Sequence, residues 1–349
     1  MRRTLLDMES RFSEPFGEYA LRCTICPRMC VIKEGERGFC DTKENKNGKL
    51  ISLTYGLLSA LAVDPIEKKP LAHFYPGSLA LSISSIGCSL TCPWCQNWHI
   101  STAKPGEQPL RYMSPKEVVA VARRQECTSI AYTYNEPLIN LNYVEDVARV
   151  ASRKDVKNVL VTNGYISIPA LEAVVDVIDA ANVDWKAFNE GFYRKHCSAD
   201  LQSVLDATVR MKEEGVHVEI TFLMIPETND DEKETRGMAR FIYENLGPDT
   251  PLHLSRFFPQ YMFNHVPITP VETLVRAREM AMEEGLRYVF VGNVQNDFDN
   301  TFCPSCGRAV IERRGYSVDG WNLDDEKRCK YCGESIAISG EREVHNPFL

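Results

Sequence analysis

The chain has 349 residues and a formal net charge of −8, with a pI near 5.5. Hydrophobic residues make up 44% and charged residues 25%, as in a soluble globular protein with one large domain plus appendages, or with two domains. The acidic balance disfavours a nucleic-acid partner held mainly through phosphates, and no apolar run reaches the 18 residues of a membrane helix.

The N-terminus, MRRTLLDMES, carries Asp7 and Glu9 before any apolar stretch suited to a signal peptide, so we expect a cytoplasmic protein. Eleven of its 13 cysteines fall into three tight groups. In a reducing compartment, short-spaced cysteines hold metal more often than they form disulfides. The sequence therefore predicts three metal centres.

Residues 1–78 are expected to form an N-terminal extension with the first group, Cys23, Cys26, Cys30 and Cys40. Its Cys-x2-Cys-x3-Cys-x9-Cys spacing contains one regular metal-binding knuckle, so zinc and an auxiliary iron–sulfur cluster both remain open. A polar turn, KENKNGK, follows. The next segment carries four charged or titratable residues, which could line the mouth of a cavity or form a solvated or ion-paired loop: Glu67, Lys68, Lys69 and His73.

Residues 79–294 alternate short β-rich apolar runs with longer stretches of helical period, a pattern typical of a parallel α/β fold. The predicted strands cover 79–84, 129–134, 158–163, 183–188, 216–221, 252–257 and 287–292. Capping boxes with proline at the first helical position predict helix starts near residues 115 and 270. Seven strand–helix units favour a partial barrel over a doubly wound sheet.

The segment GCSLTCPWCQNW, residues 87–98, places Cys88, Cys92 and Cys95 directly after the first predicted strand. A structural zinc site closes its tetrahedron with four protein ligands, whereas three thiolates leave one iron of a [4Fe-4S] cluster open to another ligand. Three packed cysteines, or a zinc site completed by His99, are the alternatives.

This Cys-x3-Cys-x2-Cys loop, with Gly87 before it and Trp94 preceding its last cysteine, resembles the cluster loop of radical S-adenosylmethionine (SAM) enzymes. The resemblance implies an α/β fold with a partial (β/α)6-type parallel barrel, a [4Fe-4S] cluster on the three cysteines, and SAM as ligand of the free iron.

Further motifs resemble segments of the same superfamily. YNEP (134–137) stands where the superfamily has a Gly-Gly-Glu-type motif, which implies that Asn135 and Glu136 lie beside the SAM amino group; its two glycines are absent, and a polar turn is the alternative. TNG (162–164) and DWK (184–186) are similar to segments of glycyl-radical-enzyme activases that approach the SAM carboxylate and ribose. The implied SAM-binding residues there are Thr162, Asn163, Asp184 and Lys186, although Asp184 and Lys186 could instead form a structural ion pair.

Arg256 lies near the end of the sixth predicted strand and could bind a SAM or substrate carboxylate, or pair with a core acid. Because strand side chains alternate, His253 and Arg256 should point to opposite faces, and only one should reach the cavity. Gly292 to Val294 could let the backbone approach the adenine, or could be a plain turn at the end of the strand. Cys127 and Cys197 are expected to be buried apolar residues.

Residues 295–349 are predicted to form a module joined by the linker QNDFDN (295–300). Two Cys-x2-Cys-Gly knuckles, at 303–307 and 329–333, are typical of a zinc ribbon or a rubredoxin. The four ligands would be Cys303, Cys306, Cys329 and Cys332, with zinc favoured over iron.

The order of these features along the chain is similar to the radical SAM member of the AmmeMemoRadiSam system, a relative of pyruvate formate-lyase activating enzymes. The resemblance implies reductive cleavage of SAM to a 5′-deoxyadenosyl radical, an electron donor such as flavodoxin or ferredoxin, and hydrogen abstraction from an unidentified peptide, protein or small molecule. A zinc-ribbon binding protein and a radical SAM tRNA-modifying enzyme are the alternatives.

Overall fold

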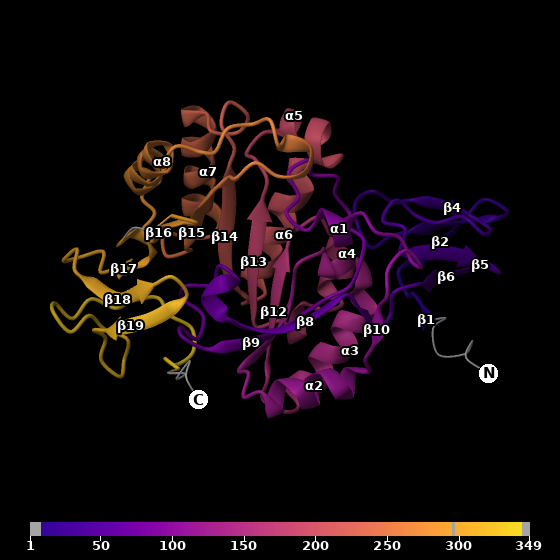
Figure 1. Cartoon of the computed structure of the whole chain (residues 1–349), viewed down its shortest axis with the longest axis horizontal. Helices are drawn as coiled ribbons and strands as arrows, with labels where there is room; N and C mark the ends of the chain where they lie inside the picture. The colour runs from indigo at the N-terminus through magenta and orange to yellow at the C-terminus, as the bar shows by residue number, and fades with distance from the viewer. Residues whose placement is uncertain (1–7, 295–296, 344–349) are drawn as a thin grey trace.

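The computed structural model describes residues 8–294 and 297–343. An eight-stranded sheet forms its centre, and two lobes of small β-hairpins lie at opposite ends of it (Figure 1). The predicted linker 295–300 is described only from Asp297, because residues 295–296 lie outside the described ranges, as do 1–7 and 344–349.

The strands of the central sheet lie in the order β16-β15-β14-β13-β12-β11-β9-β8. All except β8 are parallel and follow chain order, without the reversal that defines a doubly wound sheet. Each overlaps a predicted run, although β13 begins at Ala180 rather than Val183. The bounds are β9 (Leu79–Ser84), β11 (Ser129–Tyr132), β12 (Lys157–Thr162), β13 (Ala180–Trp185), β14 (His217–Met224), β15 (Leu252–Arg256) and β16 (Val289–Gly292).

Strand β8 (Ala60–Pro65) is an addition that the sequence did not predict. It pairs antiparallel with β9, with Ala60 opposite Ser84 and Pro65 opposite Leu79. An edge strand tolerates a proline because one side of its backbone needs no ladder partner. The sheet therefore extends into the segment assigned to the N-terminal extension.

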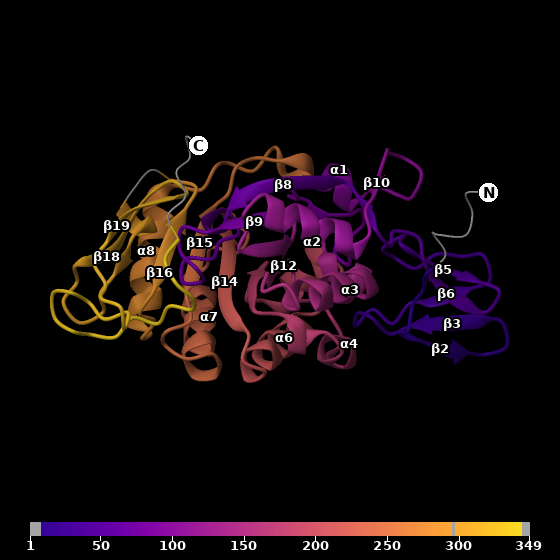
Figure 2. The same cartoon turned by 90° about the horizontal axis from the view of Figure 1, so that it is seen from below.

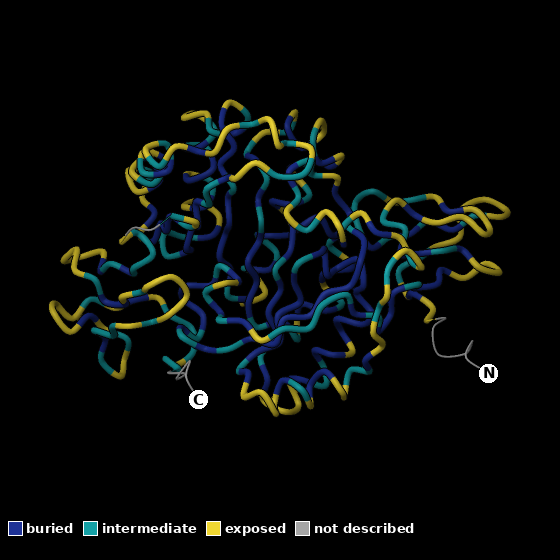
Figure 3. The backbone as a smooth tube through the Cα atoms, viewed as in Figure 1, coloured by how far each residue is buried: buried dark blue, intermediate teal, exposed yellow. Residues whose placement is uncertain are grey.

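Helices connect the parallel strands, and Figure 2 shows α4, α6 and α7 along one side of the sheet. The central strands are buried along most of their length, whereas the end hairpins and the outer helices and loops carry many exposed positions (Figure 3). The helices are α1 (Trp98–Ser101), α2 (Pro115–Arg124), α3 (Leu141–Ser152), α4 (Ile168–Glu172), α5 (Glu190–Phe192), α6 (Leu201–Glu213), α7 (Glu232–Asn245) and α8 (Val271–Glu283).

One of the two predicted capping boxes forms. Ser114 and Glu117 cap α2 reciprocally, with Pro115 as its first residue. The helix predicted to start near residue 270 begins at Val271, but its capping box does not form, because the Thr269 hydroxyl donates to the Met224 carbonyl at 2.6 Å and accepts from the Phe257 amide at 3.1 Å. This buried threonine joins the ends of β14 and β15 instead of capping α8.

The N-terminal lobe consists of short antiparallel strands. KENKNGK forms the hairpin between two of them, with Asn47 and Gly48 at positive φ (55° and 71°) as a tight two-residue turn requires. The strands are β1 (Met8–Glu9), β2 (Ser13–Phe16), β3 (Ala20–Cys23), β4 (Val31–Lys33), β5 (Lys43–Lys46) and β6 (Lys49–Ser52), with β7 (Leu57–Leu58) pairing β10 (Arg111–Tyr112).

The C-terminal lobe is a three-stranded sheet, β17 (Thr301–Phe302), β18 (Ala309–Arg314) and β19 (Ser317–Trp321). It packs on the segment before β9, where the His73 ring contacts the Ala337 carbonyl at 2.9 Å and the Thr301 hydroxyl at 3.1 Å. None of the helices in the described ranges combines the length and apolar character needed to cross a bilayer.

Candidate active site

A cavity of about 1130 Å³ opens at the carboxyl ends of the parallel strands, the edge where parallel α/β folds place their ligands. All three parts of the chain line it. The N-terminal lobe supplies Phe39 to Asp41, and the C-terminal part supplies Asp299, Arg313 and Tyr316. The sheet supplies most of the predicted site residues: Cys88, Cys92, Cys95, Asn135, Glu136, Thr162, Asn163, Asp184 and Lys186.

The three loop cysteines face this cavity from the segment after β9. The Cys88 Sγ accepts from the Leu90 amide at 3.4 Å, and the Cys95 Sγ contacts the Ser101 hydroxyl at 3.3 Å. Burial raises the pKa of Cys88 and of Cys95, so both are neutral thiols until a cation favours the thiolate. Three convergent thiols beside a large cavity fit a cluster with one open iron.

The alternative zinc site with His99 does not form. His99 is exposed, and across residues 8–294 and 297–343 the one group of three or more possible ligands whose atoms all lie within 4.8 Å of each other is elsewhere. Trp94 is buried and packs on Phe192 and Phe263, with ring centroids 5.3 and 5.5 Å apart. The predicted aromatic residue therefore anchors the loop in the core.

Asn135 fixes the start of the cluster loop. Its side-chain oxygen accepts from the Ser85 amide at 3.1 Å, and its amide nitrogen donates to the Gly87 carbonyl at 3.0 Å. Since Gly87 precedes Cys88, these contacts couple the end of β11 to the position of the first thiol. Tyr134 before it has φ 69°, a strained conformation for a residue with a side chain.

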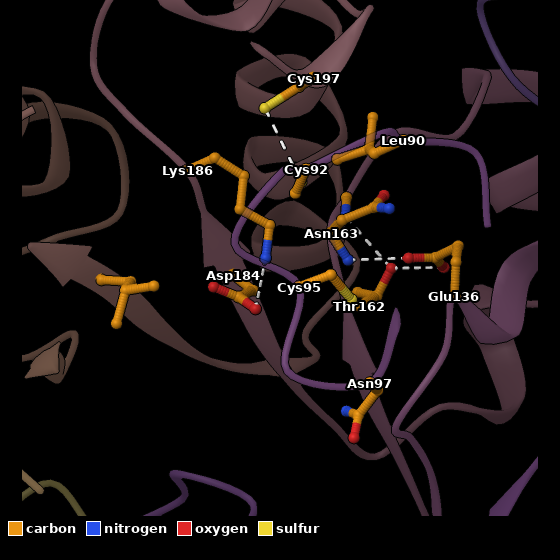
Figure 4. A network of polar contacts seen from close by, with 12 residues as sticks. Leu90, Cys92, Cys95, Asn97, Glu136, Thr162, Asn163, Asp184, Lys186 and Cys197 are labelled. Carbon is orange, nitrogen blue, oxygen red and sulfur yellow. Dashed lines mark hydrogen bonds and ion pairs between the residues drawn. The ribbon is translucent and has the colours of Figure 1, made fainter. Parts of the chain in front are cut away.

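Glu136 joins the ends of two neighbouring strands (Figure 4). Its carboxylate accepts from the Thr162 hydroxyl and the Asn163 amide, both at 2.8 Å, and from the Leu138 amide at 3.0 Å. Pro137 begins a short 3-10 helix (Pro137–Asn140). The turn raised as an alternative therefore forms, and Asn135 and Glu136 line the cavity as well. Burial raises the pKa of Glu136, although these donors oppose the shift.

Asp184 and Lys186 form an ion pair, with Nζ and Oδ2 2.6 Å apart, and both line the cavity (Figure 4). The two alternatives raised for them are therefore compatible. Burial alone would lower the pKa of Lys186, but the charges of Asp184 and Cys92 outweigh it and raise that pKa. Lys186 is thus a fixed cation near the cluster loop.

Arg256 is placed differently from the other predicted site residues. Its Nε donates to the Thr269 carbonyl at 2.7 Å, and it is not among the described residues that line the cavity. His253 and Ser255 line it instead, as the alternation of side chains along the strand allows, so the lining gives Arg256 no support as a ligand of SAM or substrate. Gly292 to Val294 line the cavity.

The charged segment before β9 is largely ion-paired, with Lys69 and His73 buried and Lys68 exposed. Lys69 is 2% exposed, and its Nζ lies 2.7 Å from Asp64 Oδ2. The Tyr134 hydroxyl donates to the same carboxylate. Glu67, Lys68 and Lys69 line the cavity, whereas His73 is buried outside it. Asp64 was missed because it lies in the unpredicted strand β8.

Cys197 was also missed as a site residue. It is fully buried, as predicted, but it ends a π-helical turn (Tyr193–Cys197) that brings its Sγ to 3.8 Å from the Cys92 Sγ (Figure 4). π-turns are uncommon and concentrate at functional sites. No local pattern in the sequence announces this contact.

The C-terminal quartet is the group whose ligand atoms all lie within 4.8 Å of one another: Cys303, Cys306, Cys329 and Cys332. Its cross pairs Cys303–Cys332 and Cys306–Cys329 have Sγ separations of 3.5 and 3.8 Å. The backbone amide of Glu334 lowers the pKa of Cys332 to about 7. Such a set of thiols can bind one tetrahedral metal ion.

The comparisons with known proteins agree with this geometry. Residues 82–239 match the radical SAM superfamily. The chain is 47% identical to the uncharacterized protein MJ0808 of Methanocaldococcus jannaschii, over 95% of this chain and 99% of that protein. It is 24% identical to a probable GTP 3′,8-cyclase of Pyrococcus abyssi, over 66% of this chain and 79% of that protein. A radical SAM methyltransferase structure from Sphaerobacter thermophilus shares the fold, with a TM-score of 0.50 and 14% identity over 83% of this chain and 78% of that one.

A parallel sheet with a three-cysteine loop at its carboxyl edge, together with these relatives, defines the class as an iron–sulfur enzyme that uses SAM. The chain belongs to the radical SAM superfamily. A [4Fe-4S] cluster and SAM follow from this membership, and the zinc-ribbon binding protein without enzymatic activity is no longer an alternative.

Proposed function

We propose that Cys88, Cys92 and Cys95 bind three irons of the [4Fe-4S] cluster and leave the fourth for SAM. The observation that carries the proposal is the convergence of these three thiols on a cavity of about 1130 Å³. Bound there, the cluster and SAM would supply one-electron cleavage of the sulfonium to methionine and a 5′-deoxyadenosyl radical, which takes a hydrogen atom from the substrate.

In this proposal the remaining cavity residues bind and position SAM. Asp184 and Lys186 are a charged pair suited to its carboxylate and ribose groups. Asn135 and Glu136 lie beside the amino group, where they act mainly by holding the ends of β9, β11 and β12 in place, since their side chains already bond within the protein.

The proposed organisation comprises an N-terminal extension (1–78), a partial radical SAM barrel (79–294) and a C-terminal zinc-ribbon or rubredoxin-like module (295–349). Strand β8 supports one change to these bounds, because it pairs with β9 and so attaches the end of the extension to the sheet. Both flanking modules line the cavity, which supports a role in enclosing the substrate.

Membership of the AmmeMemoRadiSam type, related to pyruvate formate-lyase activating enzymes, is part of the proposal, as is a flavodoxin or ferredoxin as electron donor. A cytoplasmic location is consistent with thiols that must stay reduced. The substrate is an unidentified peptide, protein or small molecule.

Anaerobic reconstitution with iron and sulfide, followed by dithionite and SAM, tests the proposal. We expect 5′-deoxyadenosine and methionine in equal amounts from the wild type and background levels from Cys92→Ala. Cys127→Ala removes a buried thiol outside the cavity lining and should retain cleavage. A wild-type protein that takes up the cluster and binds SAM without cleaving it would contradict the proposal.

A further inference from the structure

The N-terminal quartet Cys23, Cys26, Cys30 and Cys40 converges on a second, much smaller cavity of about 20 Å³. Cys23 ends β3, the next two lie in the turn to β4, and Cys40 precedes β5. All four line the cavity, together with Lys43, Arg28 and Ser89. Thiols from three parts of the lobe are thus collected around one small cavity.

A buried cation faces this space. Lys43 is 1% exposed, and its Nζ donates to the neutral Ser52 hydroxyl at 3.0 Å. No carboxylate of the described residues forms a salt bridge with it. A buried ammonium group is costly unless negative charge lies nearby. Lys43 therefore indicates an anionic occupant, as four thiolates around a metal centre would be.

The spread of the sulfurs separates the kinds of metal centre. With metal–sulfur bonds near 2.3 Å, a tetrahedral single-ion site sets its thiolates about 3.8 Å apart. The C-terminal quartet matches this, at 3.5 and 3.8 Å. The thiolates of a [4Fe-4S] cluster stand farther apart, because a cube of iron and sulfide lies between them.

The N-terminal quartet has the wider spread. Although all four cysteines lie in described residues, no three of their Sγ atoms lie within 4.8 Å of one another. The same holds for Cys88, Cys92 and Cys95, the triplet proposed to hold a [4Fe-4S] cluster. The two groups resemble each other and differ from the compact C-terminal quartet.

We propose that Cys23, Cys26, Cys30 and Cys40 bind a second [4Fe-4S] cluster, with every iron bound by a thiolate, whereas the C-terminal quartet binds a single metal ion. This assignment goes beyond the proposed function and does not depend on SAM cleavage. The cysteine spacing left zinc and an iron–sulfur cluster open at this site, and the assignment favours the cluster.

The second site lies directly against the cluster loop. A Cβ atom on Gly87 would meet the Cys40 carbonyl oxygen at 2.7 Å, and the Arg28 guanidinium donates to the Ser89 carbonyl at 2.9 Å. Cys40 lines both cavities. Because the sites adjoin, variants are needed to assign iron to one or the other.

The test uses the full chain with Cys88→Ala, Cys92→Ala and Cys95→Ala, which removes the SAM-binding cluster. After anaerobic reconstitution, iron, acid-labile sulfide and zinc are counted per chain, and the Mössbauer spectrum is recorded. We expect about four irons and four sulfides to remain, with a [4Fe-4S] spectrum. Two zinc ions without sulfide would overturn the assignment.

Two further variants locate the iron in this background. Cys23→Ser with Cys26→Ser should abolish the remaining sulfide, whereas Cys303→Ser with Cys306→Ser should leave it and release the single metal ion. Sulfide that disappears with the C-terminal pair instead would contradict the proposal. Circular dichroism checks that each chain folds; if the N-terminal pair does not fold, the counts on the triple variant still decide between zinc and a cluster. Failure of SAM cleavage in the wild type would refute the proposed function and leave this result unaffected.

Discussion

The Sγ of Cys197 lies 3.8 Å from the Sγ of Cys92, a proposed cluster ligand. The contact, followed by burial, raises the pKa of Cys92. If Cys92 binds iron as a thiolate, the Cys197 S–H becomes a donor to it. Hydrogen bonds to cluster sulfurs are one means by which proteins set the reduction potential.

We therefore predict that Cys197→Ala lowers the reduction potential of the SAM-binding cluster without reducing its iron content. A hydrogen bond that favours the reduced state by about 1 kcal/mol corresponds to a shift on the order of 40 mV for one electron. Potentiometric titration followed by EPR measures the shift. Cys127→Ala, another buried thiol, is the control, and an equal potential in both variants would refute a tuning role.

The second prediction concerns the pair of Asp184 and Lys186. Removing one partner leaves the other as an uncompensated charge beside the cavity, and both lie where SAM is proposed to bind. Asp184→Asn and Lys186→Met should each weaken SAM binding roughly tenfold or more, about 1.4 kcal/mol, by isothermal titration calorimetry.

The matched control for that pair is Asp249→Asn, which breaks the exposed ion pair with Arg287 at 3.1 Å. Exposed pairs contribute little to stability, and this one lies outside the cavity lining. If Lys186→Met binds SAM as tightly as this control, the pair has only a structural role.

The third prediction compares two glycines that share a positive φ. At Gly87 (φ 83°) a Cβ atom would lie 2.6 Å from the Thr42 side chain, whereas at Gly106 (φ 97°) nothing lies within 4 Å. Gly87→Ala should lower the free energy of unfolding by about 1–3 kcal/mol more than Gly106→Ala, because the N-terminal lobe must move away from the cluster loop. Urea denaturation of the two variants gives the difference directly, and equal losses would show that the close packing there is not constrained.

The fourth prediction is a pH dependence. Burial raises the pKa of Asp299 to about 6, against the opposing charges of Arg313 and His253. A carboxyl whose pKa is higher in the folded state stabilises the fold below its ordinary value near 3.9, and that contribution is lost as pH rises through 6. Between pH 4 and pH 6 the wild type should therefore lose on the order of 1 kcal/mol relative to Asp299→Asn, allowing for solvent screening. Denaturation series at both pH values measure it, with Asp297→Asn on the same turn as the control; parallel curves would contradict the shift.

Local chemistry made much of the architecture predictable. The seven parallel strands are short, apolar and rich in β-branched residues, and Ser114 with Glu117 marks a helix start through contacts three residues apart. Strand β8 escaped prediction because an edge strand is half exposed and tolerates Asp64 and Pro65. The capping box predicted at Thr269 does not form, because its hydroxyl bonds to Met224 and Phe257 at the ends of two strands.

The site shows the same division. The spacing of Cys88, Cys92 and Cys95 was enough to predict the three-thiol loop, because the three cysteines lie close together in the sequence. Alternation along β15 predicted that one of His253 and Arg256 reaches the cavity, but the choice depends on how the sheet curves around it. The contact between Cys92 and Cys197 depends on a π-turn about a hundred residues downstream, which no local pattern encodes.

The central claim is that the loop leaves one iron free to bind SAM. Electron–nuclear double resonance on the reduced protein, with SAM labelled by ¹⁷O in its carboxylate, tests it most directly. Using Cys23→Ser with Cys26→Ser keeps the second proposed cluster out of the spectrum. We predict strong ¹⁷O coupling to the cluster, lost in Cys92→Ala; a reduced [4Fe-4S] signal unchanged by labelled SAM would contradict the account.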